Sequence, residues 1–237
     1  MINYFIKFDD LSLSTVRLFT YDENGSRQVK KYSVIDAKEA LLPGNNLYIM
    51  IPSALFGFKV TNNEIGLKSD ILKANIFSES EDGLISNVSD LKFFFQPGLN
   101  LAAWINSSTY NSIAEHFNEF EGDVYFYPEH FLLPDGINAI YVGEQNFICS
   151  FKDFTGFSGS NKSLEDYLQV LLSAGLDLKK LQVLGESEPV LLNKFKDLNF
   201  KKAQFSEFHI SFLNSTKFSN VNFFKRKLSF HYIKQKL

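Results

Sequence analysis

Short apolar runs bounded by turn residues recur along the whole chain, and segments with helical spacing lie between them. Residues 3–8 and 14–21 alternate apolar and polar side chains, which predicts two strands joined through a turn at residues 9–10. A strong turn signal, Asp-Glu-Asn-Gly, occupies residues 22–25, and residues 27–32 are predicted to return as a third strand. The chain therefore begins with a meander of three strands.

The rest of the chain mixes both kinds of element. Apolar residues at helical spacing predict helices at residues 35–42, 69–77, 108–120 and 164–174. Strands are expected at residues 47–51, 55–60, 91–95, 99–105, 124–127, 137–142, 147–151, 180–184 and 205–213. The Gly- and Ser-rich residues 155–163 predict a flexible loop, and Ser69 and either Ser107 or Ser108 are the expected helix caps. Because strands and helices are interspersed throughout, the fold class is α/β, or mixed α+β.

Charge and cysteine content exclude several classes of protein. The net charge of −3 argues against general nucleic-acid binding. The single cysteine, Cys149, allows no intramolecular disulfide and no cysteine zinc cluster, which fits a reducing compartment. It follows Phe147 and Ile148 in an apolar run, so we expect a buried structural thiol. The 26 phenylalanines fit a Phe-rich core, with exposure of some of them to a partner as the alternative.

The sequence predicts neither a targeting signal nor a membrane span. Its N-terminus lacks a basic region, and the apolar stretch there is too short for a signal peptide. A run of roughly 18 apolar residues, which a membrane helix needs, is not found in the sequence. We therefore expect a soluble protein.

Common catalytic patterns are also missing from the sequence. The four histidines, His116, His130, His209 and His231, do not pair at metal-ligand spacing. His209 is expected to be a structural residue within an apolar strand. The sequence has no Walker loop and no Gly-x-Ser-x-Gly elbow, and residues 155–160 lack the lysine and glycine spacing of a phosphate loop. We therefore predict no catalytic residue, no cofactor and no metal.

Residues 214–237 differ in kind from the rest of the chain. They hold six Lys and Arg residues and no acidic residue, and aromatic side chains lie between the cations. A solvated basic tail is one interpretation, and a nucleic-acid patch is a second. We favour a third, a juxtamembrane segment, because the cytoplasmic flanks of membrane helices collect cations and aromatic residues. The predicted membrane-proximal residues are Lys225, Arg226, Lys227, Lys234 and Lys236.

The order of several short motifs resembles one known family. Residues 47–52 (Leu-Tyr-Ile-Met-Ile-Pro) resemble its apolar strand ending in proline, and residues 71–76 resemble its helix before an acidic stretch. Residues 126–134 resemble its P-x-x-x-L-P turn, which the hairpin at 137–151 follows. Residues 210–214 resemble its N-L-L-x-G segment, although the Asn and Gly of that segment are missing. In this order the motifs resemble the cytoplasmic domain of type II secretion system protein L.

The resemblance implies an actin-like, ribonuclease H-like fold built from two related halves. We expect an actin-like domain at residues 1–213, with halves at approximately 1–98 and 99–213, and a basic juxtamembrane tail at 214–237. Residues 6–12 and 140–146 are then equivalent hairpin turns. In nucleotide-binding relatives each such turn carries Asp and Gly, which approach the phosphates and hold Mg²⁺ through water. Here the first turn has aspartates without glycine and the second has Gly143 without aspartate, so ATP binding is not expected.

The resemblance also implies a function. It is a non-catalytic scaffold of the inner-membrane secretion platform, which recruits the secretion ATPase by binding the N-terminal domain of that enzyme. Platform proteins M and F and an anionic membrane surface are the other expected partners, a homodimer is left open, and nucleic acid is not expected. The expected location is the cytoplasmic side of the bacterial inner membrane. The alternatives are the type IV pilus assembly protein M and an actin-like ATPase or sugar kinase, which would need intact phosphate turns.

Overall fold

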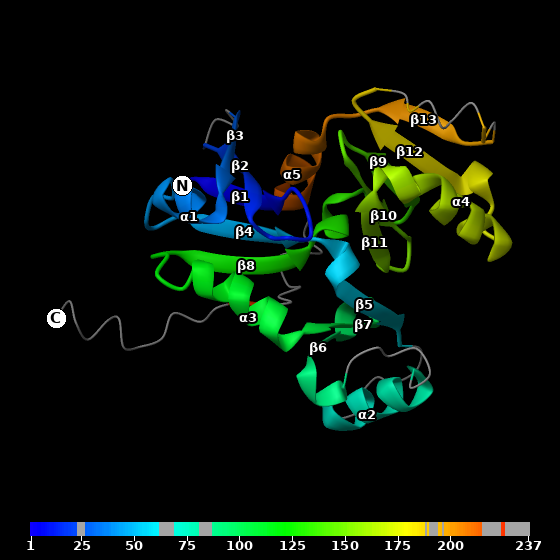
Figure 1. Cartoon of the computed structure of the whole chain (residues 1–237), viewed down its shortest axis with the longest axis horizontal. Helices are drawn as coiled ribbons and strands as arrows, with labels where there is room; N and C mark the ends of the chain where they lie inside the picture. The colour runs from blue at the N-terminus through cyan, green and yellow to red at the C-terminus, as the bar shows by residue number, and fades with distance from the viewer. Residues whose placement is uncertain are drawn as a thin grey trace. The chain divides into compact units, whose positions relative to one another are not determined.

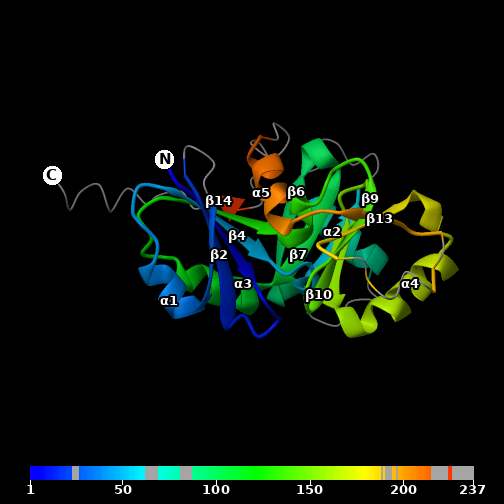
Figure 2. The same cartoon turned by 90° about the horizontal axis from the view of Figure 1, so that it is seen from above.

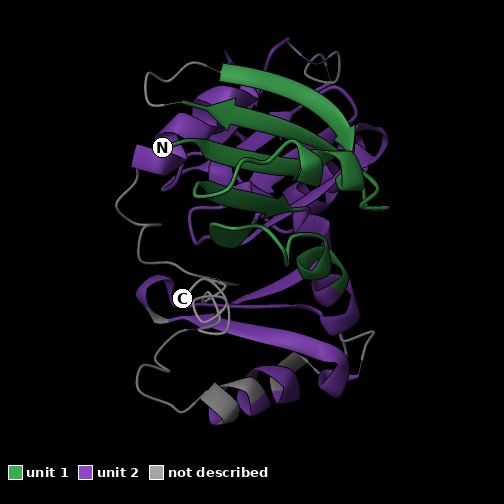
Figure 3. Cartoon of the chain, turned by 90° about the vertical axis from the view of Figure 1, so that its left-hand side faces the viewer, with its two compact units in different colours: residues 1–51, 112–127, 222–237 green, residues 52–111, 128–221 purple. Residues whose placement is uncertain are grey.

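The computed structural model describes residues 1–22, 27–61, 69–80, 87–187, 189, 194–195, 197–214 and 224–225. These residues form two compact units (Figure 3). Unit 1 takes the described residues of 1–51, 112–127 and 222–237, and unit 2 takes those of 52–111 and 128–221. This division differs from the predicted halves 1–98 and 99–213, because the chain leaves the first sheet after residue 51 and returns to it at residues 123–128.

The sheet of unit 1 has six strands. They are β1 (Asn3–Phe8), β2 (Thr15–Tyr21), β3 (Arg27–Ser33), β4 (Asn46–Ile51), β8 (Asp123–Pro128) and β14 (Phe224–Lys225). The strand order is β14-β8-β4-β1-β2-β3, which places β3 at one edge (Figure 1). The first three strands form the predicted meander with antiparallel pairing, and β4 lies parallel to β1. Helix α1 (Val34–Glu39) follows β3, and the hydroxyl of Ser33 caps it by accepting a hydrogen bond from the Asp36 amide at 3.1 Å.

The larger sheet of unit 2 repeats this arrangement with five strands. They are β9 (Asn138–Val142), β10 (Asn146–Ser150), β11 (Gly156–Ser160), β12 (Leu181–Gly185) and β13 (Asn199–Lys202). The order is β11-β10-β9-β12-β13, again an antiparallel meander followed by a strand parallel to its first member. The order β3-β2-β1-β4-β8 in the first sheet corresponds strand by strand to β11-β10-β9-β12-β13 in the second, so that β1 is the equivalent of β9 and β3 of β11. The two sheets therefore carry the duplication that the sequence indicated at the two hairpin turns.

A smaller antiparallel sheet completes unit 2. Its strands are β5 (Phe56–Val60), β6 (Leu91–Gln96) and β7 (Leu101–Asn106), in the order β5-β7-β6, and helix α2 (Ser69–Ser80) belongs to the same region. Ile76 of α2 is buried with Ala102, and Trp104 packs against them. The Trp104 ring also lies over Gly57, where a Cβ atom would come within 2.2 Å of it. The glycine therefore allows the indole to lie directly on the neighbouring strand.

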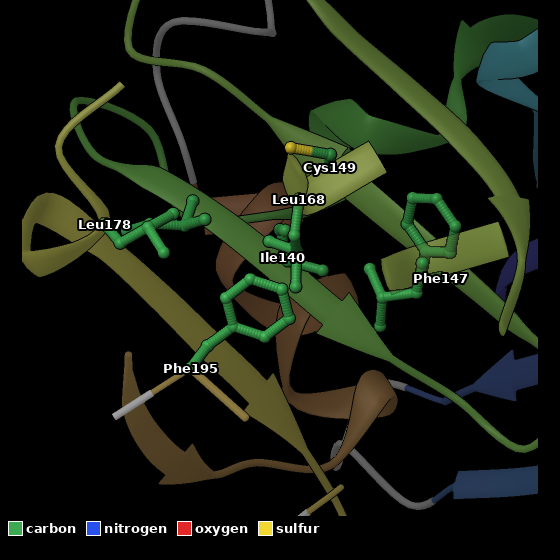
Figure 4. Close-up of a cluster of buried hydrophobic side chains, with 8 residues drawn as sticks. Ile140, Phe147, Cys149, Leu168, Leu178 and Phe195 are labelled. Carbon is green, nitrogen blue, oxygen red and sulfur yellow. The ribbon is translucent and has the colours of Figure 1, made fainter. Parts of the chain in front are cut away.

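Helix α4 (Leu164–Ser173) covers the five-stranded sheet of unit 2 (Figure 2). Leu164 and Leu168 pack into a buried cluster with Ile140 of β9 and Phe147 of β10 (Figure 4). Cys149 belongs to the same cluster and is fully buried, which confirms the prediction of a buried thiol. Burial raises the pKa of the Cys149 thiol above its ordinary value, so the thiol is poorly suited to act as a nucleophile.

Two predicted elements are wrong. Residues 156–160, predicted as part of a flexible loop, form strand β11, which pairs with β10 along its whole length. Residues 205–213, predicted as a strand, belong to helix α5 (Phe205–Asn214). Its buried side chains Phe205, Phe208, His209 and Phe212 recur at helical spacing, while Ile210 is 46% exposed. A strand would have placed Ile210 on the same face as Phe208 and Phe212.

The third predicted helix differs in detail. Helix α3 (Ser107–His116) begins after Asn106, whose side-chain oxygen accepts hydrogen bonds from the amides of Ser108 (2.9 Å) and Thr109 (3.3 Å). Asn106 is therefore the cap, not Ser107 or Ser108. The helix ends before Phe117, although Phe117 is buried as predicted. Short 3-10 helices connect other elements: η1 (Ser53–Leu55), η3 (Val88–Asp90), η4 (Pro97–Leu99), η5 (Glu129–Leu132), η6 (Asn161–Ser163) and η7 (Leu178–Lys180).

The C-terminal end contributes to the sheet of unit 1. Phe224 and Lys225 form β14, which pairs antiparallel with Phe126 and Tyr125 of β8. The predicted tail at 214–237 therefore includes two residues that belong to the folded sheet, and its first residue is the last of α5. Within the described ranges, none of the helices is both long and apolar enough to cross a membrane.

Candidate functional site

The hairpin turn between β1 and β2 is held by charge. One carboxylate oxygen of Asp9 accepts a hydrogen bond from Nε of Arg17 at 2.9 Å, and the other lies 2.8 Å from Nζ of Lys31. The Asp9 side chain is only 12% exposed, so both ion pairs are partly shielded from water. Asp10 turns toward Ser12, whose amide donates to it at 2.8 Å. The two aspartates of this turn are therefore engaged with groups of the chain itself.

The equivalent turn between β9 and β10 is held by amide hydrogen bonds. The Gly143 amide donates to the Asn146 carbonyl at 2.9 Å, and the Gly143 carbonyl accepts from the side chain of Asn161 at 2.9 Å. The Asn161 amide in turn donates to the Gln145 carbonyl at 2.8 Å. A phosphate group held by a glycine-containing turn needs backbone N–H groups directed at it. The Gly143 amide is directed instead at its own hairpin.

These two turns were the predicted equivalents of phosphate-binding turns, and both lie where the sequence placed them. In the first, a carboxylate that could hold Mg²⁺ through water faces two cations of the same protein, which oppose a divalent metal by charge. In the second, the glycine amide bonds within the turn. The local chemistry of each turn thus favours closing the hairpin over holding a magnesium nucleotide.

A buried polar network in unit 2 was not predicted. Ser53 and His130 are 1% and 0% exposed, and Ser53 Oγ lies 2.8 Å from His130 Nδ1. The amide of His130 donates to the same Oγ at 3.1 Å, and the amide of Ser53 donates to a carboxylate oxygen of Glu129 at 3.3 Å. His130 Nε2 lies 3.0 Å from the carbonyl oxygen of Phe154. Three separate segments of unit 2 therefore meet at one imidazole.

The hydrogen-bond partners fix the tautomer of His130. A carbonyl oxygen can only accept, so Nε2 carries the proton and donates it to Phe154, while Nδ1 accepts from the Ser53 hydroxyl. Burial lowers the pKa of His130 to about 4, although the hydrogen bond to Phe154 and the charge of Asp153 oppose the shift. The imidazole is neutral at physiological pH. Because Ser53 and His130 are both buried, this serine–histidine pair serves the fold and not nucleophilic catalysis.

The network follows a repeated local pattern. Strand β4 ends before Pro52 and the 3-10 helix η1, and strand β8 ends at Pro128 before the 3-10 helix η5. Each proline stops a strand and allows the tight turn that follows. Ser53 follows the proline after β4, and Glu129 and His130 follow the proline at the end of β8. The repetition of strand, proline and polar residue is the sequence signal that could have identified the network.

The predicted membrane-proximal residues fall mostly outside the described part of the chain. The backbone of Lys225 lies in β14, opposite Tyr125. Arg226, Lys227, Lys234 and Lys236 lie outside the described residues. Of the five predicted residues, only Lys225 lies in the described part of the chain, in the last strand of the unit 1 sheet. The role of these residues in membrane binding stays a prediction.

The remaining candidate groups of the described residues lie apart from one another. Among the described residues, His, Cys, Asp and Glu side chains do not gather in any group of three that could hold a metal ion. His209 is fully buried in α5, and His116 lies at the C-terminal end of α3. A pocket of about 350 Å³ within unit 2 lies between α5, β12, β13 and residues 131–135. Its charged lining residues, among them Lys201, Lys202 and Glu207, are exposed and of both signs.

Comparisons with known proteins identify the fold. The sequence matches no family model and no curated protein. Among solved structures, the chain is similar to the cytoplasmic domain of EpsL, an inner membrane component of the type II secretion system of Vibrio cholerae, with a TM-score of 0.70 and 11% identity over 94% of this chain and 98% of that one. It is also similar to a Bacteroides thetaiotaomicron protein of unknown function with an actin-like ATPase fold, with a TM-score of 0.53 and 10% identity over 90% and 96% of the two chains.

Both similarities run over nearly the whole length of each chain. They confirm the predicted fold class, with its mixed sheets and flanking helices, and they account for the two sheets of matching strand order. At such low identity the similarity establishes the fold alone. The chain therefore has an actin-like fold, which it shares with the cytoplasmic domain of a type II secretion protein L.

Proposed function

We propose that this chain is a non-catalytic scaffold of the type II secretion inner-membrane platform, and that it recruits the cytoplasmic secretion ATPase to the membrane. The observation that carries the proposal is the similarity to the EpsL cytoplasmic domain over 94% of this chain and 98% of that one. The match therefore runs over nearly the whole length of both chains compared. A fold alone supports many functions, so the local chemistry has to be consistent with the proposal as well.

The hairpin turns support the non-catalytic part of the proposal. The ion pairs of Asp9 and the hydrogen bonds of Gly143 occupy the groups that a magnesium nucleotide would need. The buried imidazole of His130 bonds to a hydroxyl and a carbonyl of its own unit. A scaffold needs a stable surface and no reactive centre, which is consistent with side chains that are engaged inside the fold.

The proposal includes partners and a location. The N-terminal domain of the secretion ATPase is the first partner, and the platform proteins M and F are the others. A second copy of the chain is a further candidate. The domain acts on the cytoplasmic face of the bacterial inner membrane, and nucleic acid is not among its ligands.

The basic C-terminal end is proposed to lie against the membrane. Lys225, Arg226, Lys227, Lys234 and Lys236 supply five cations. Each adds about 1 kcal/mol of attraction to an anionic leaflet, and the attraction weakens as salt shortens the Debye length. Co-sedimentation with vesicles, with and without anionic lipid, measures this. Replacing all five cations by Ser should abolish binding to anionic vesicles, and unchanged binding would contradict the membrane role.

Co-purification tests the scaffold directly. The complete chain and the N-terminal domain of the cognate secretion ATPase are mixed without nucleotide and separated by size-exclusion chromatography. Co-elution at low salt or at high salt supports the proposal. Separate elution under both conditions contradicts it. The N-terminal domain of a pilus ATPase from the same bacterium is the matched control and should elute alone.

A nucleotide-binding role is the second candidate function. It is favoured by the similarity to the Bacteroides thetaiotaomicron protein with an actin-like ATPase fold. A pilus assembly protein M-like role belongs to this class, and so does an actin-like ATPase. Binding of magnesium ATP by the purified chain distinguishes both from the proposed scaffold.

A further inference from the structure

Strand β3 ends the sheet of unit 1 in the described part of the chain. It is seven residues long and pairs with β2 from Arg27 to Ser33. Its first five residues are exposed, on both faces of the strand. Exposed edge strands of this length offer a row of backbone hydrogen-bonding groups to another extended segment. A strand from another protein could therefore add to the sheet of unit 1 beside β3.

The direction of the backbone groups on β3 follows from two hydrogen bonds. The Val34 amide donates to the Ser14 carbonyl at 3.1 Å, so residues 14 and 34 form a hydrogen-bonded antiparallel pair. The register continues this pairing to residues 16 and 32 and to residues 18 and 30. Even-numbered residues of β3 therefore direct their backbone groups at β2. Odd-numbered residues, among them Val29 and Lys31, direct theirs away from the sheet.

A bond in the neighbouring pair supports this assignment. The Asp9 amide donates to the Thr15 carbonyl at 3.1 Å, so the odd-numbered residues of β2 direct their backbone N–H and C=O groups at β1. The even-numbered residues of β2 must then direct theirs at β3, which agrees with the bond from Val34 to Ser14. The outward N–H and C=O groups of Val29 and Lys31 are spaced two residues apart, as the ladder of an added strand needs.

The charge of β3 selects the partner. Arg27, Lys30 and Lys31 are exposed on this strand, which carries no acidic residue. Two copies of β3 paired edge to edge would bring these cations together, and like charges on facing strands destabilise the pair. A strand with acidic side chains would place opposite charges there instead. Charge thus opposes a second copy of this chain and favours an acidic segment.

The equivalent strand of unit 2 lacks these properties. Strand β11 is five residues long, and its sequence, Gly-Phe-Ser-Gly-Ser, has no charge. The Ala54 amide of η1 donates to Ser158 Oγ in the middle of β11 at 3.1 Å. The third strand of each meander thus has a different environment: η1 packs on β11, whereas β3 is exposed.

We propose that β3 is a docking edge for an extended, acidic segment of a partner protein, which adds to the unit 1 sheet as a further strand. The outward groups of Val29 and Lys31 hydrogen-bond to the backbone of that segment. Arg27 and Lys30 of β3 contact its carboxylates, while the side chain of Lys31 stays paired with Asp9. This mode of recognition reads extended conformation and charge, and it is independent of whether the partner is the secretion ATPase.

The first experiment uses the isotope-labelled complete chain and two synthetic seven-residue peptides. One peptide alternates Glu and Val, and the other alternates Lys and Val. Amide NMR spectra and amide hydrogen exchange are recorded as each peptide is added. The acidic peptide should shift and protect the amides of Val29 and Lys31, and the basic peptide should not. Equal responses to both peptides, or none at these two amides, would overturn the proposal.

Two variants separate backbone docking from surface attraction. Val29→Pro removes an outward N–H that β2 does not use, and edge strands tolerate proline where the N–H faces solvent. It should abolish binding of the acidic peptide, while the control Val29→Ala, which keeps the N–H, should bind as the unchanged protein does. If Val29→Pro fails to fold, Lys30→Glu replaces it and should weaken binding about threefold.

The remaining outcomes are equally decisive. Full binding by folded Val29→Pro, or by Lys30→Glu, would show that β3 is not the docking edge. Protection of Val29 and Lys31 that rises with protein concentration in the absence of peptide would identify a second copy as the occupant, and it would overturn the acidic segment.

Discussion

The two sheets share one strand order and differ in how each is finished. In unit 1 the first hairpin turn is closed by ion pairs from Asp9 to Arg17 and Lys31, and the third strand is exposed. In unit 2 the corresponding turn is closed by hydrogen bonds of Gly143 and Asn161, and the third strand packs against η1. Backbone pairing thus preserves the order of strands in both sheets, while the turns and the edge strands differ in their chemistry.

Close packing explains why the third strand of unit 2 is rich in glycine. A Cβ atom on Gly156 would lie 2.4 Å from the His130 ring and 2.5 Å from the Cys149 carbonyl oxygen. A Cβ atom on Gly159 would lie 3.0 Å from the Phe147 ring. The glycines thus allow β11 to approach the buried imidazole and the core. In β3, whose first five residues are exposed, long charged side chains take their place.

The substitution Gly156→Ala should have the largest effect on stability, because a Cβ atom there prevents the close approach of β11 to His130 and Cys149. Neither the imidazole nor the backbone carbonyl can retreat easily, so we expect a loss of about 3 kcal/mol or more in the free energy of unfolding. Urea denaturation followed by the fluorescence of Trp104, the single tryptophan, measures this in unit 2. The control Gly98→Ala, with no atom within 4 Å of the new Cβ, should change stability by less than about 0.5 kcal/mol.

Acid should destabilise unit 2 through His130. The pKa of His130 is about 4 in the folded chain and 6.5 ordinarily, so between pH 4 and 6.5 the unfolded chain binds a proton that the folded chain does not. The stabilising contribution is complete above pH 6.5 and is lost as the pH falls toward 4, by about 3 kcal/mol in total. Trp104 denaturation curves at a series of pH values should show this slope. The variant His130→Gln should flatten it, and an unchanged slope would contradict the assignment.

Removing the Ser53 hydroxyl should cost somewhat less. Ser53→Ala leaves His130 Nδ1 and the His130 amide without their buried partner, which predicts a loss of about 2 kcal/mol. The control is Ser173→Ala, because the exposed Ser173 hydroxyl bonds only within α4, to the Gln169 carbonyl. Equal stability of the two variants in urea denaturation would show that the network contributes little.

The two turns should differ in their response to salt. Asp9→Asn should destabilise unit 1 by about 1 kcal/mol at low salt, and the difference should shrink at high salt because the ion pairs are partly exposed. Asn161→Ala, which opens the turn of unit 2, should cost about 1 kcal/mol at any salt concentration. Amide hydrogen exchange at each hairpin measures both. A salt effect of the same size at both turns would contradict the distinction.

Local patterns in the sequence predicted most of the elements correctly. The strands at 3–8 and 14–21 were predictable because alternation and turn residues act within a few positions. Residues 205–213 contain both an alternating and a helical pattern, and only the burial of Phe205 and His209 with exposure of Ile210 decides for the helix. Glycines in β11 suggested flexibility, although tertiary packing against His130 and Phe147 is their reason.

Features that join distant segments were not predictable in the same way. The ion pair of Asp9 with Lys31 depends on the register of β2 and β3, and the contact of Ser53 with His130 joins residues 77 positions apart. The sequence did indicate the two hairpin turns and their missing Asp or Gly, because those residues lie within one turn each. It did not indicate what replaced them, since Arg17, Lys31 and Asn161 are brought in by the fold.

Calorimetric titration of the chain with magnesium ATP shows whether the two hairpin turns can hold a nucleotide. In this actin-like fold both turns are closed by the protein's own groups. An actin-like ATPase titrated in the same buffer is the control and should give saturable heat. We expect no saturable heat from this chain. Saturable binding of magnesium ATP with a micromolar Kd would show that the turns remain open to a nucleotide.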